Sequence, residues 1–504
     1  MQSLPDLCEI EKVIGMDALT EQSATAIVKA IKAKKISAVE VLQAQLDRIK
    51  AKNDAINAVV TLDEAGAMER AKAADEALAK GENWGPLHGL PMTIKDSWET
   101  KGLRTTAGAN EYADHVPTED AAPVARLKVA GAIVFGKTNL PAYAADIQTD
   151  NPLFGKTNNP WNQDLTVGGS SGGAAAALAT GMTPLELGSD LAGSIRIPAA
   201  MCGVYGHKPS FRAMPMRGHI PGPPGTLSEV DLAVGGPLAR HGEDLGLAMD
   251  VLAGAGGREA VGWTLKFPKP RHKALKDYRI ACWFDDPFCP VQGALRDQLE
   301  AMADVLEKEG AQVDRQARPA FSLEHSHDIY FSLLAAVAAA GLPPGSFSQL
   351  DRGLPLLKLA AKLGLVPKAL ADYAKGATQQ AREWIGVNEA RAHLRAGWDQ
   401  FFTQYDLMLT PVLPTNAFAH VTEGSVVKRK LEIDGTVRNY LDLFIWPGLA
   451  GASYLPASVA PIGVCADGLP GAVQIIGPYL EDKTCMDFAV KLGKVFGGFV
   501  APPQ

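Results

Sequence analysis

The first 80 residues follow a helical pattern of apolar and polar positions. Ser37 and Glu40 form a capping-box sequence, and apolar residues recur at helical spacing from there to Ile49. An alanine-rich stretch over residues 64–80 continues the pattern. The sequence therefore predicts that residues 1–80 form a mainly helical N-terminal segment that packs on the core of the protein.

Beyond residue 81 the pattern changes to short, largely apolar runs of strand type that are bounded by Gly and Pro. Helical stretches such as 292–308 separate these runs, and this alternation is typical of an α/β sheet. The runs that predict strands are 90–94, 132–135, 185–187, 279–284, 407–409 and 472–476.

Two later segments lack strand signals and chemical motifs. Residues 329–402 are dense in Ala, Leu and Lys, which predicts a helical, lid-like insertion that could cap a pocket. Residues 420–450 are expected to form a loop. We expect both segments to shape substrate specificity.

Composition limits the possible partners. The chain has 504 residues and a formal net charge of −7, so its overall charge does not attract phosphate backbones or anionic lipids. We therefore expect no nucleic-acid partner and no membrane partner.

The six cysteines form no CxxC pair, which argues against a zinc ribbon and a disulfide framework. Because no secretory-type leader and no run of about 18 apolar residues is found, the expected location is cytoplasmic.

The segment from Gly131 to Thr138 matches the P-loop pattern G-x-x-x-x-G-K-[ST]. A phosphate cradle needs a flexible loop between its glycines, whereas residues 132–135 are an apolar run that predicts a buried strand. We favour the strand. The alternative, a P-loop-like nucleotide binder, predicts that ATP stabilises the protein against heat.

Residues 168–173 read GGSSGG and contain G-x-S-x-G, so Ser170 could be the serine of a nucleophile elbow. That elbow needs a strand before the serine, whereas residues 159–167 resemble a loop. Residues 174–178 favour a helix, which places Ser170 and Ser171 at a helix N-terminus with free backbone N–H groups. A Gly/Ser cap on a buried helix is the structural alternative.

A third segment runs from a strand-like stretch at 184–187 into a tight turn that ends at Ser194. Such a turn can direct consecutive backbone N–H groups at one oxygen atom. Taken alone, this loop does not identify an activity.

Together with an upstream stretch from Gly89 to Asp96, the two serine segments resemble the amidase signature family. The stretch reads GLPMTIKD; Ser170 follows its Lys95 by 75 residues, and Ser194 follows Ser170 by 24 residues. Further stretches that resemble family blocks, in the expected order, are 136–139, 159–161, 406–411, 455–457 and 468–477. The resemblance implies a single large α/β/α sandwich with a mixed central β-sheet, here residues 81–504 with the insertion at 329–402.

The resemblance also implies roles for individual residues. Ser194 would be the nucleophile, Ser170 the bridging serine after a cis Gly169–Ser170 bond, and Lys95 the general base. The oxyanion hole would be formed by the backbone N–H groups of Leu191, Ala192, Gly193 and Ser194. Residues expected to support this site are Ser171, Ser189, Asp190 and Arg196. For Asp190 and Arg196, a purely structural ion pair is an equal alternative.

These roles are chemically consistent with the sequence. A serine hydroxyl needs a base to take its proton, and no histidine lies close to either serine in the sequence. Lys95, with an ordinary pKa of about 10.4, can serve only if burial favours its neutral amine. Asp96 would oppose that effect, but successive side chains of an extended segment point to opposite faces, so we expect Asp96 to face away.

Departures from the family pattern bear on the substrate. Many relatives have GTDTGGS where this chain has Ser189, Leu191 and Ala192, and many carry Glu or Gln where Ala142 stands. Less polar residues favour hydrolysis of small-molecule amides, anilides or carbamates.

The alternative within the family is the amidase subunit of a tRNA-dependent amidotransferase, which needs partner subunits. We expect no cofactor and no metal, and a homodimer is possible.

Overall fold

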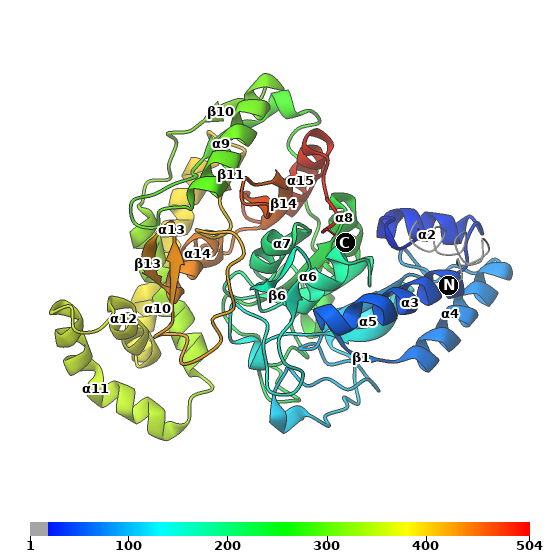
Figure 1. The fold of residues 1–504 in the computed structure, drawn as a ribbon, viewed down its shortest axis with the longest axis horizontal. Helices are drawn as coiled ribbons and strands as arrows, with labels where there is room; N and C mark the ends of the chain where they lie inside the picture. Colours follow the sequence, from blue (N-terminus) through cyan, green and yellow to red (C-terminus); the bar gives the residue numbers. More distant parts are fainter. Residues whose placement is uncertain (1–18, 504) are drawn as a thin grey trace, which may run out of the picture.

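The computed structural model describes residues 19–503, and their core is a mixed sheet of eleven strands. Figure 1 shows the N-terminal helices on one side of this sheet and a group of helices from the third quarter of the chain on the other. The predicted fold class, an α/β/α sandwich with a mixed central sheet, is confirmed.

The strands follow the spatial order β1-β3-β2-β6-β8-β7-β14-β15-β11-β9-β10. Pairing is parallel between β2 and β3, β2 and β6, β9 and β10, and β9 and β11, and antiparallel elsewhere. Their bounds are β1 Val59–Leu62, β2 Pro91–Lys95, β3 Ile133–Thr138, β6 Leu185–Asp190, β7 Tyr205–Lys208, β8 Val234–Ala239, β9 Arg279–Cys282, β10 Gln312–Asp314, β11 Leu407–Thr410, β14 Ala457–Val464 and β15 Pro470–Ile476.

Helices cover both faces of the sheet. Tyr205 and Gly206 are successive residues of β7, so their side-chain positions point to opposite faces. Tyr205 lies against α8 and α15, whereas the position of Gly206 lies against Ile195 and Ala199 at the start of α7. The helices that pack on the sheet are α3 Ala38–Ile56, α4 Glu64–Ala79, α6 Gly172–Ala179, α7 Arg196–Cys202, α8 Gly242–Leu252, α9 Gly293–Lys308 and α15 Asp482–Phe496, with α2 Ala24–Lys32 and α5 Ala122–Val129 against α8.

The N-terminal segment is less separate than the sequence predicts. Residues 1–18 lie outside the described residues, and α2, α3 and α4 follow the expected helical pattern, including the capping box at Ser37 and Glu40. Val59–Leu62, however, forms β1, an edge strand of the central sheet that pairs with β3. The segment therefore contributes a strand to the sheet as well as helices.

The predicted insertion is helical and begins slightly earlier than residue 329. Its helices are α10 Leu323–Ala339, α11 Pro344–Lys362, α12 Lys368–Ala377 and α13 Ala381–Phe401. Helix α10 packs against α14, Ile445–Ala452, and so connects the insertion to the body of the protein. Within 420–450, where we expected a loop, β12 Lys430–Ile433 and β13 Thr436–Asn439 form a hairpin.

The P-loop alternative does not fit the fold. Ile133–Thr138 is the strand β3 inside the sheet, as the apolar run predicts. The buried Lys137 donates hydrogen bonds from Nζ to the carbonyl oxygen of Trp98 and to the hydroxyls of Thr100 and Thr105. The segment therefore lacks the open phosphate-binding loop that nucleotide binding requires.

The close contact of α6 with the sheet gives a stability test. A Cβ atom at Gly173 would lie 2.4 Å from the backbone nitrogen of Asn139 and 2.7 Å from the carbonyl oxygen of Ala58. We expect Gly173→Ala to lower the free energy of unfolding by about 1–3 kcal/mol in chemical denaturation, because backbone atoms must move. Gly246→Ala in α8, where a Cβ meets nothing within 4 Å, is the control. It should stabilise the protein by about 0.5–1 kcal/mol, and equal effects of the two variants would contradict the packing described.

Candidate active site

The sheet brings the three predicted segments to one edge. Strands β2 and β6 are parallel neighbours, with Ile94 opposite Leu187, so their carboxyl ends lie side by side. Lys95 ends β2, and the loop that follows β6 carries Ser194 before α7 begins. Ser170 lies just before the buried helix α6, which contacts both β2 and β6.

Lys95 lies at the centre of this arrangement. Its Nζ donates a 2.7 Å hydrogen bond to Oγ of Ser170 and a 3.0 Å hydrogen bond to Oγ of Ser189. The amine is fully buried, and desolvation lowers the pKa of Lys95 to about 7, although the nearby carboxylates of Asp190 and Glu186 oppose the shift. A large fraction of the amine is therefore neutral near pH 7.

Asp96 faces away from Lys95, as the extended backbone predicts. Its carboxylate accepts hydrogen bonds from the backbone N–H and the hydroxyl of Thr106, at 3.1 Å and 2.5 Å. Burial raises the pKa of Asp96 to about 6, against the opposing charge of Lys137. Asp96 is thus part of the neighbouring polar cluster around Lys137.

The two serine loops lie against each other. The backbone N–H of Ser171 donates a 3.0 Å hydrogen bond to the carbonyl oxygen of Ser194, and the Gly169–Ser170 bond is cis. Among residues 19–503 no hydrogen bond joins the Ser170 and Ser194 side chains. Ser170 is buried, whereas Ser194 is partly exposed and can meet a substrate.

The Ser171 side chain does not cap helix α6 but connects the start of that helix to β6. Its hydroxyl donates to the carbonyl oxygen of Ser189 at 3.3 Å and accepts from the N–H of Ser189 at 3.4 Å. It makes no side-chain cap to helix α6. The serine therefore ties the start of the helix to the end of β6.

Asp190 and Arg196 form a buried ion pair around the Ser194 loop. The Arg196 guanidinium donates to both carboxylate oxygens of Asp190, from Nε at 2.9 Å and from its second terminal nitrogen at 2.8 Å. It also donates to the carbonyl oxygen of Pro447 and to the side chain of Gln474. Burial alone would raise the pKa of Asp190, but Arg196 and the N–H donors lower it to about 2. The pair is therefore buried and ionised, and it encloses the loop that carries Ser194.

The backbone amides of this loop are not equivalent. Asp190 accepts hydrogen bonds from the N–H groups of Gly193 at 2.9 Å and Ile195 at 3.1 Å. Within the described part of the chain, the N–H groups of Leu191, Ala192 and Ser194 have no acceptor. The candidate oxyanion donors are therefore these three, one fewer than predicted, because the amide of Gly193 is already engaged.

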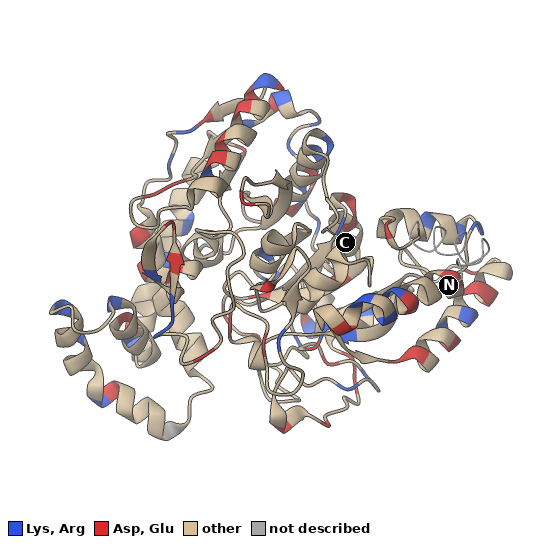
Figure 2. Ribbon diagram, viewed as in Figure 1, with Lys and Arg blue, Asp and Glu red and all other residues tan. Residues whose placement is uncertain are grey.

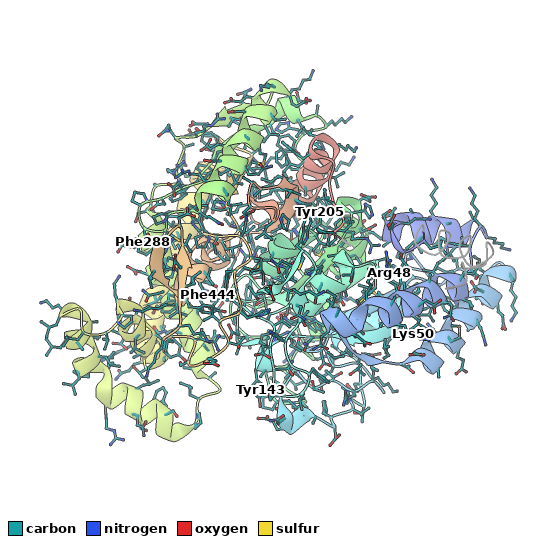
Figure 3. The ribbon with its side chains drawn as sticks, viewed as in Figure 1. Arg48, Lys50, Tyr143, Tyr205, Phe288 and Phe444 are labelled. Atoms are coloured by element: carbon teal, nitrogen blue, oxygen red, sulfur yellow. The ribbon has the colours of Figure 1, made fainter. Side chains whose placement is uncertain are left out.

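Helices α10 and α13 of the insertion supply apolar neighbours that sequence reasoning missed. Leu191 and Ala192 belong to a cluster with Tyr330, Leu334 and Leu394, which come from α10 and α13. Phe444, labelled in Figure 3, packs between this cluster and the main core. No local signal connects positions so far apart in the chain, so only the fold reveals which residues surround Leu191.

Charged groups at the border of this cluster are paired with one another. Arg391 donates from one guanidinium nitrogen to both carboxylate oxygens of Asp231, at 3.0 Å and 2.8 Å. The hydroxyl of Tyr454 donates to the same carboxylate, and the guanidinium of Arg391 lies over the Tyr454 ring. These contacts satisfy the two charges within the protein.

Neither a candidate metal cluster nor a membrane-spanning helix is found among the described residues. No group of three or more His, Cys, Asp or Glu side chains there could hold a metal ion. None of the helices described is long and apolar enough to cross a bilayer. Figure 2 shows charged residues of both signs along outer helices such as α3 and α9.

The chain is similar to known proteins over most of its length. The amidase family model matches residues 40–486. The chain is 32% identical over 487 residues to a glutamyl-tRNA(Gln) amidotransferase subunit from Carboxydothermus hydrogenoformans, covering 93% of this chain and 96% of the relative. A relative of the same name from Roseiflexus castenholzii is 33% identical over 471 residues, with coverages of 90% and 91%.

Among solved structures, a bacterial aryl acylamidase described as an amidase signature enzyme superposes with a TM-score of 0.76 at 27% identity. That match covers 94% of this chain and 96% of the other. Since both the family match and the shared fold extend over most of its length, the chain belongs to the amidase signature family of hydrolases that act on carbon–nitrogen bonds.

Proposed function

We propose that this protein is a cofactor-independent serine amidohydrolase that cleaves small, weakly polar amides, anilides or carbamates. The observation that carries the proposal is the buried 2.7 Å hydrogen bond from Lys95 to Ser170, beside a loop with three uncommitted backbone amides. A desolvated lysine of lowered pKa is a base, and a set of preorganised N–H groups stabilises an oxyanion. Ser194, partly exposed on that loop, is the group such an arrangement would activate.

In the proposed mechanism, neutral Lys95 takes a proton from Ser170 while Ser170 takes one from Ser194. The Ser194 oxygen attacks the substrate carbonyl, and the developing oxyanion receives hydrogen bonds from the amides of Leu191, Ala192 and Ser194. The proton returns through Ser170 to the departing amine, which leaves an acyl-enzyme. Water, deprotonated by the same relay, then hydrolyses the ester and releases Ser194. The short hydrogen bond between Ser170 and Ser194 that the relay requires would form when substrate closes the site.

The apolar cluster beside Leu191 supports the choice of substrate class. Apolar side chains favour substrates whose groups next to the scissile bond are aryl or alkyl, because burial of apolar surface is favourable. A free amino acid substrate would need unpaired charged groups for its ammonium and carboxylate. Asp231 and Arg391, which border the cluster, are already satisfied by each other.

A second candidate is the amidase subunit of a tRNA-dependent amidotransferase. It is favoured by the curated relatives from Carboxydothermus hydrogenoformans and Roseiflexus castenholzii, each of which is named as a glutamyl-tRNA(Gln) amidotransferase subunit. In that role the chain would work within a complex whose overall substrate includes tRNA, contrary to the expectation of a small-molecule partner alone. The relatives' names favour this candidate, and the lining of the site favours the first.

A substrate panel separates the two candidates. The purified chain would be assayed alone against a nitroanilide, a nitrophenyl carbamate, a nitrophenyl ester, an aliphatic amide and L-glutamine. We expect turnover of the anilide or carbamate and a rate with glutamine at least about a hundredfold lower, because Asp231 and Arg391, the charged pair beside the apolar cluster, are already satisfied by each other. Preferential hydrolysis of glutamine would instead support the amidotransferase role.

Removal of each relay group gives the second test. Ser194→Ala should reduce kcat/KM by at least about a thousandfold without changing the melting temperature by more than a few degrees, since the nucleophile is lost. Ser170→Ala and Lys95→Ala should be comparably severe, because the three act as a unit. Ser326→Ala, which alters a buried serine of α10, is the control and should retain activity. Substantial turnover by Ser194→Ala would refute the assigned roles.

The pKa of Lys95 predicts the pH dependence. Protonation removes the base, so kcat/KM should fall as pH drops through about 7 and rise about tenfold between pH 6 and pH 8. Asp190, with a pKa of about 2, stays ionised throughout this range. The measurement is a pH profile of kcat/KM with the best substrate of the panel. A flat profile from pH 6 to pH 9 is incompatible with Lys95 as the base.

A further inference from the structure

The peptide unit between Leu191 and Ala192 has contacts on both of its sides. Because a trans peptide is planar, its carbonyl oxygen and its N–H point in opposite directions. The Leu191 carbonyl oxygen accepts a 3.1 Å hydrogen bond from the hydroxyl of Tyr330, a residue of the lid helix α10. The Ala192 N–H on the other side has no acceptor in the described structure and is one of the candidate oxyanion donors.

Tyr330 is held firmly enough to fix this peptide. It is fully buried, and its ring lies against α14, where a Cβ at Gly448 would approach to 2.5 Å and one at Gly451 to 3.2 Å. Two glycines therefore permit the ring to pack directly on the helix backbone. Burial also raises the pKa of Tyr330, so its hydroxyl remains a neutral donor over the working pH range.

Helix α14 also holds the other end of the loop. The carbonyl oxygen of its Pro447 accepts a 2.7 Å hydrogen bond from Arg196, the partner of Asp190. A Cβ at Gly193 would lie 3.0 Å from the Pro447 side chain. The loop is thus supported from α7, α10 and α14 together.

We propose that Tyr330 is a positioning residue of the oxyanion hole, through which the lid helix α10 orients and polarises the Ala192 amide. This inference rests on the proposed hydrolase function. A hydrogen bond to the carbonyl of a peptide strengthens the donor at its N–H, because linked hydrogen bonds polarise one another. The lid would therefore contribute to catalysis as well as cover the pocket.

Such a role affects the transition state more than the bound substrate. The carbonyl oxygen carries negative charge only in the tetrahedral states of acylation and deacylation, so a misoriented donor lowers kcat more than it raises KM. If Tyr330 only stabilised the fold, its replacement would lower the concentration of active enzyme and the melting temperature. It would not selectively weaken the binding of tetrahedral adducts.

The test is Tyr330→Phe, which keeps the ring and removes only the hydroxyl. With the best chromogenic substrate of the panel, we expect kcat to fall about tenfold and KM to change less than twofold. The dissociation constant of phenylboronic acid, which forms a tetrahedral adduct with a serine nucleophile, should rise about tenfold in calorimetry. Tyr373→Phe is the control, because Tyr373 packs against the same apolar cluster and, among residues 19–503, only the Tyr330 hydroxyl of these two tyrosines has a hydrogen bond to the loop.

If Tyr330→Phe folds poorly, Gly451→Ala provides a milder displacement of the ring, with an expected smaller loss of kcat at unchanged KM. A kcat within twofold of the parent protein in these variants, or a loss carried by KM alone, overturns the role of Tyr330.

Ser194→Ala separates this failure from that of the proposed function. If Ser194→Ala is inactive while Tyr330→Phe is fully active, only the positioning role is wrong. If Ser194→Ala retains turnover, the proposed hydrolase function is wrong, and the role of Tyr330 falls with it.

Discussion

The site depends on the burial of one amine. Transfer of the Lys95 side chain from water to the end of β2 disfavours its charged form, and the carboxylates of Asp190 and Glu186 only partly offset that effect. The same burial places its Nζ within hydrogen-bond distance of two serines, Ser170 and Ser189. A single environment thus sets the protonation state of the Lys95 amine and also points it at the serine hydroxyls. A histidine would need no desolvation to act as a base at neutral pH, because its ordinary pKa is about 6.5.

The second requirement is that the loop of residues 191–194 keeps some of its backbone N–H groups out of helix and sheet hydrogen bonds. The Asp190 carboxylate consumes the N–H groups of Gly193 and Ile195, and its charge is balanced by Arg196. An ion pair buried to this degree gains little free energy overall, but removal of one partner is costly, so it specifies a conformation. Here the conformation leaves the amide of Ala192 without an acceptor among residues 19–503, while the Tyr330 hydroxyl of α10 donates to the carbonyl oxygen on the other side of the same peptide unit.

Much of this could be predicted from the sequence, because the features involved are local. Short apolar runs predict β2, β3 and β6, and the resemblance to the amidase signature family, carried by three short motifs in order and spacing, implies that Lys95, Ser170 and Ser194 belong to one site. The strand β1 was missed because four residues give too weak a signal inside a helical region. The engagement of the Gly193 amide and the contact of Tyr330 with Leu191 could not be predicted, since they follow from loop geometry and from packing between distant segments.

The central claim is that burial leaves a large fraction of the Lys95 amine uncharged at neutral pH, and its own titration tests that claim most directly. In protein labelled with carbon-13 at the lysine ε position, the Lys95 signal would be assigned by comparison with a Lys95→Ala variant and followed between pH 5 and pH 11. The account predicts a transition near pH 7, set by desolvation. A transition near the ordinary lysine value of about 10.4 would contradict it, because the amine would then be charged when the enzyme has to act as a base.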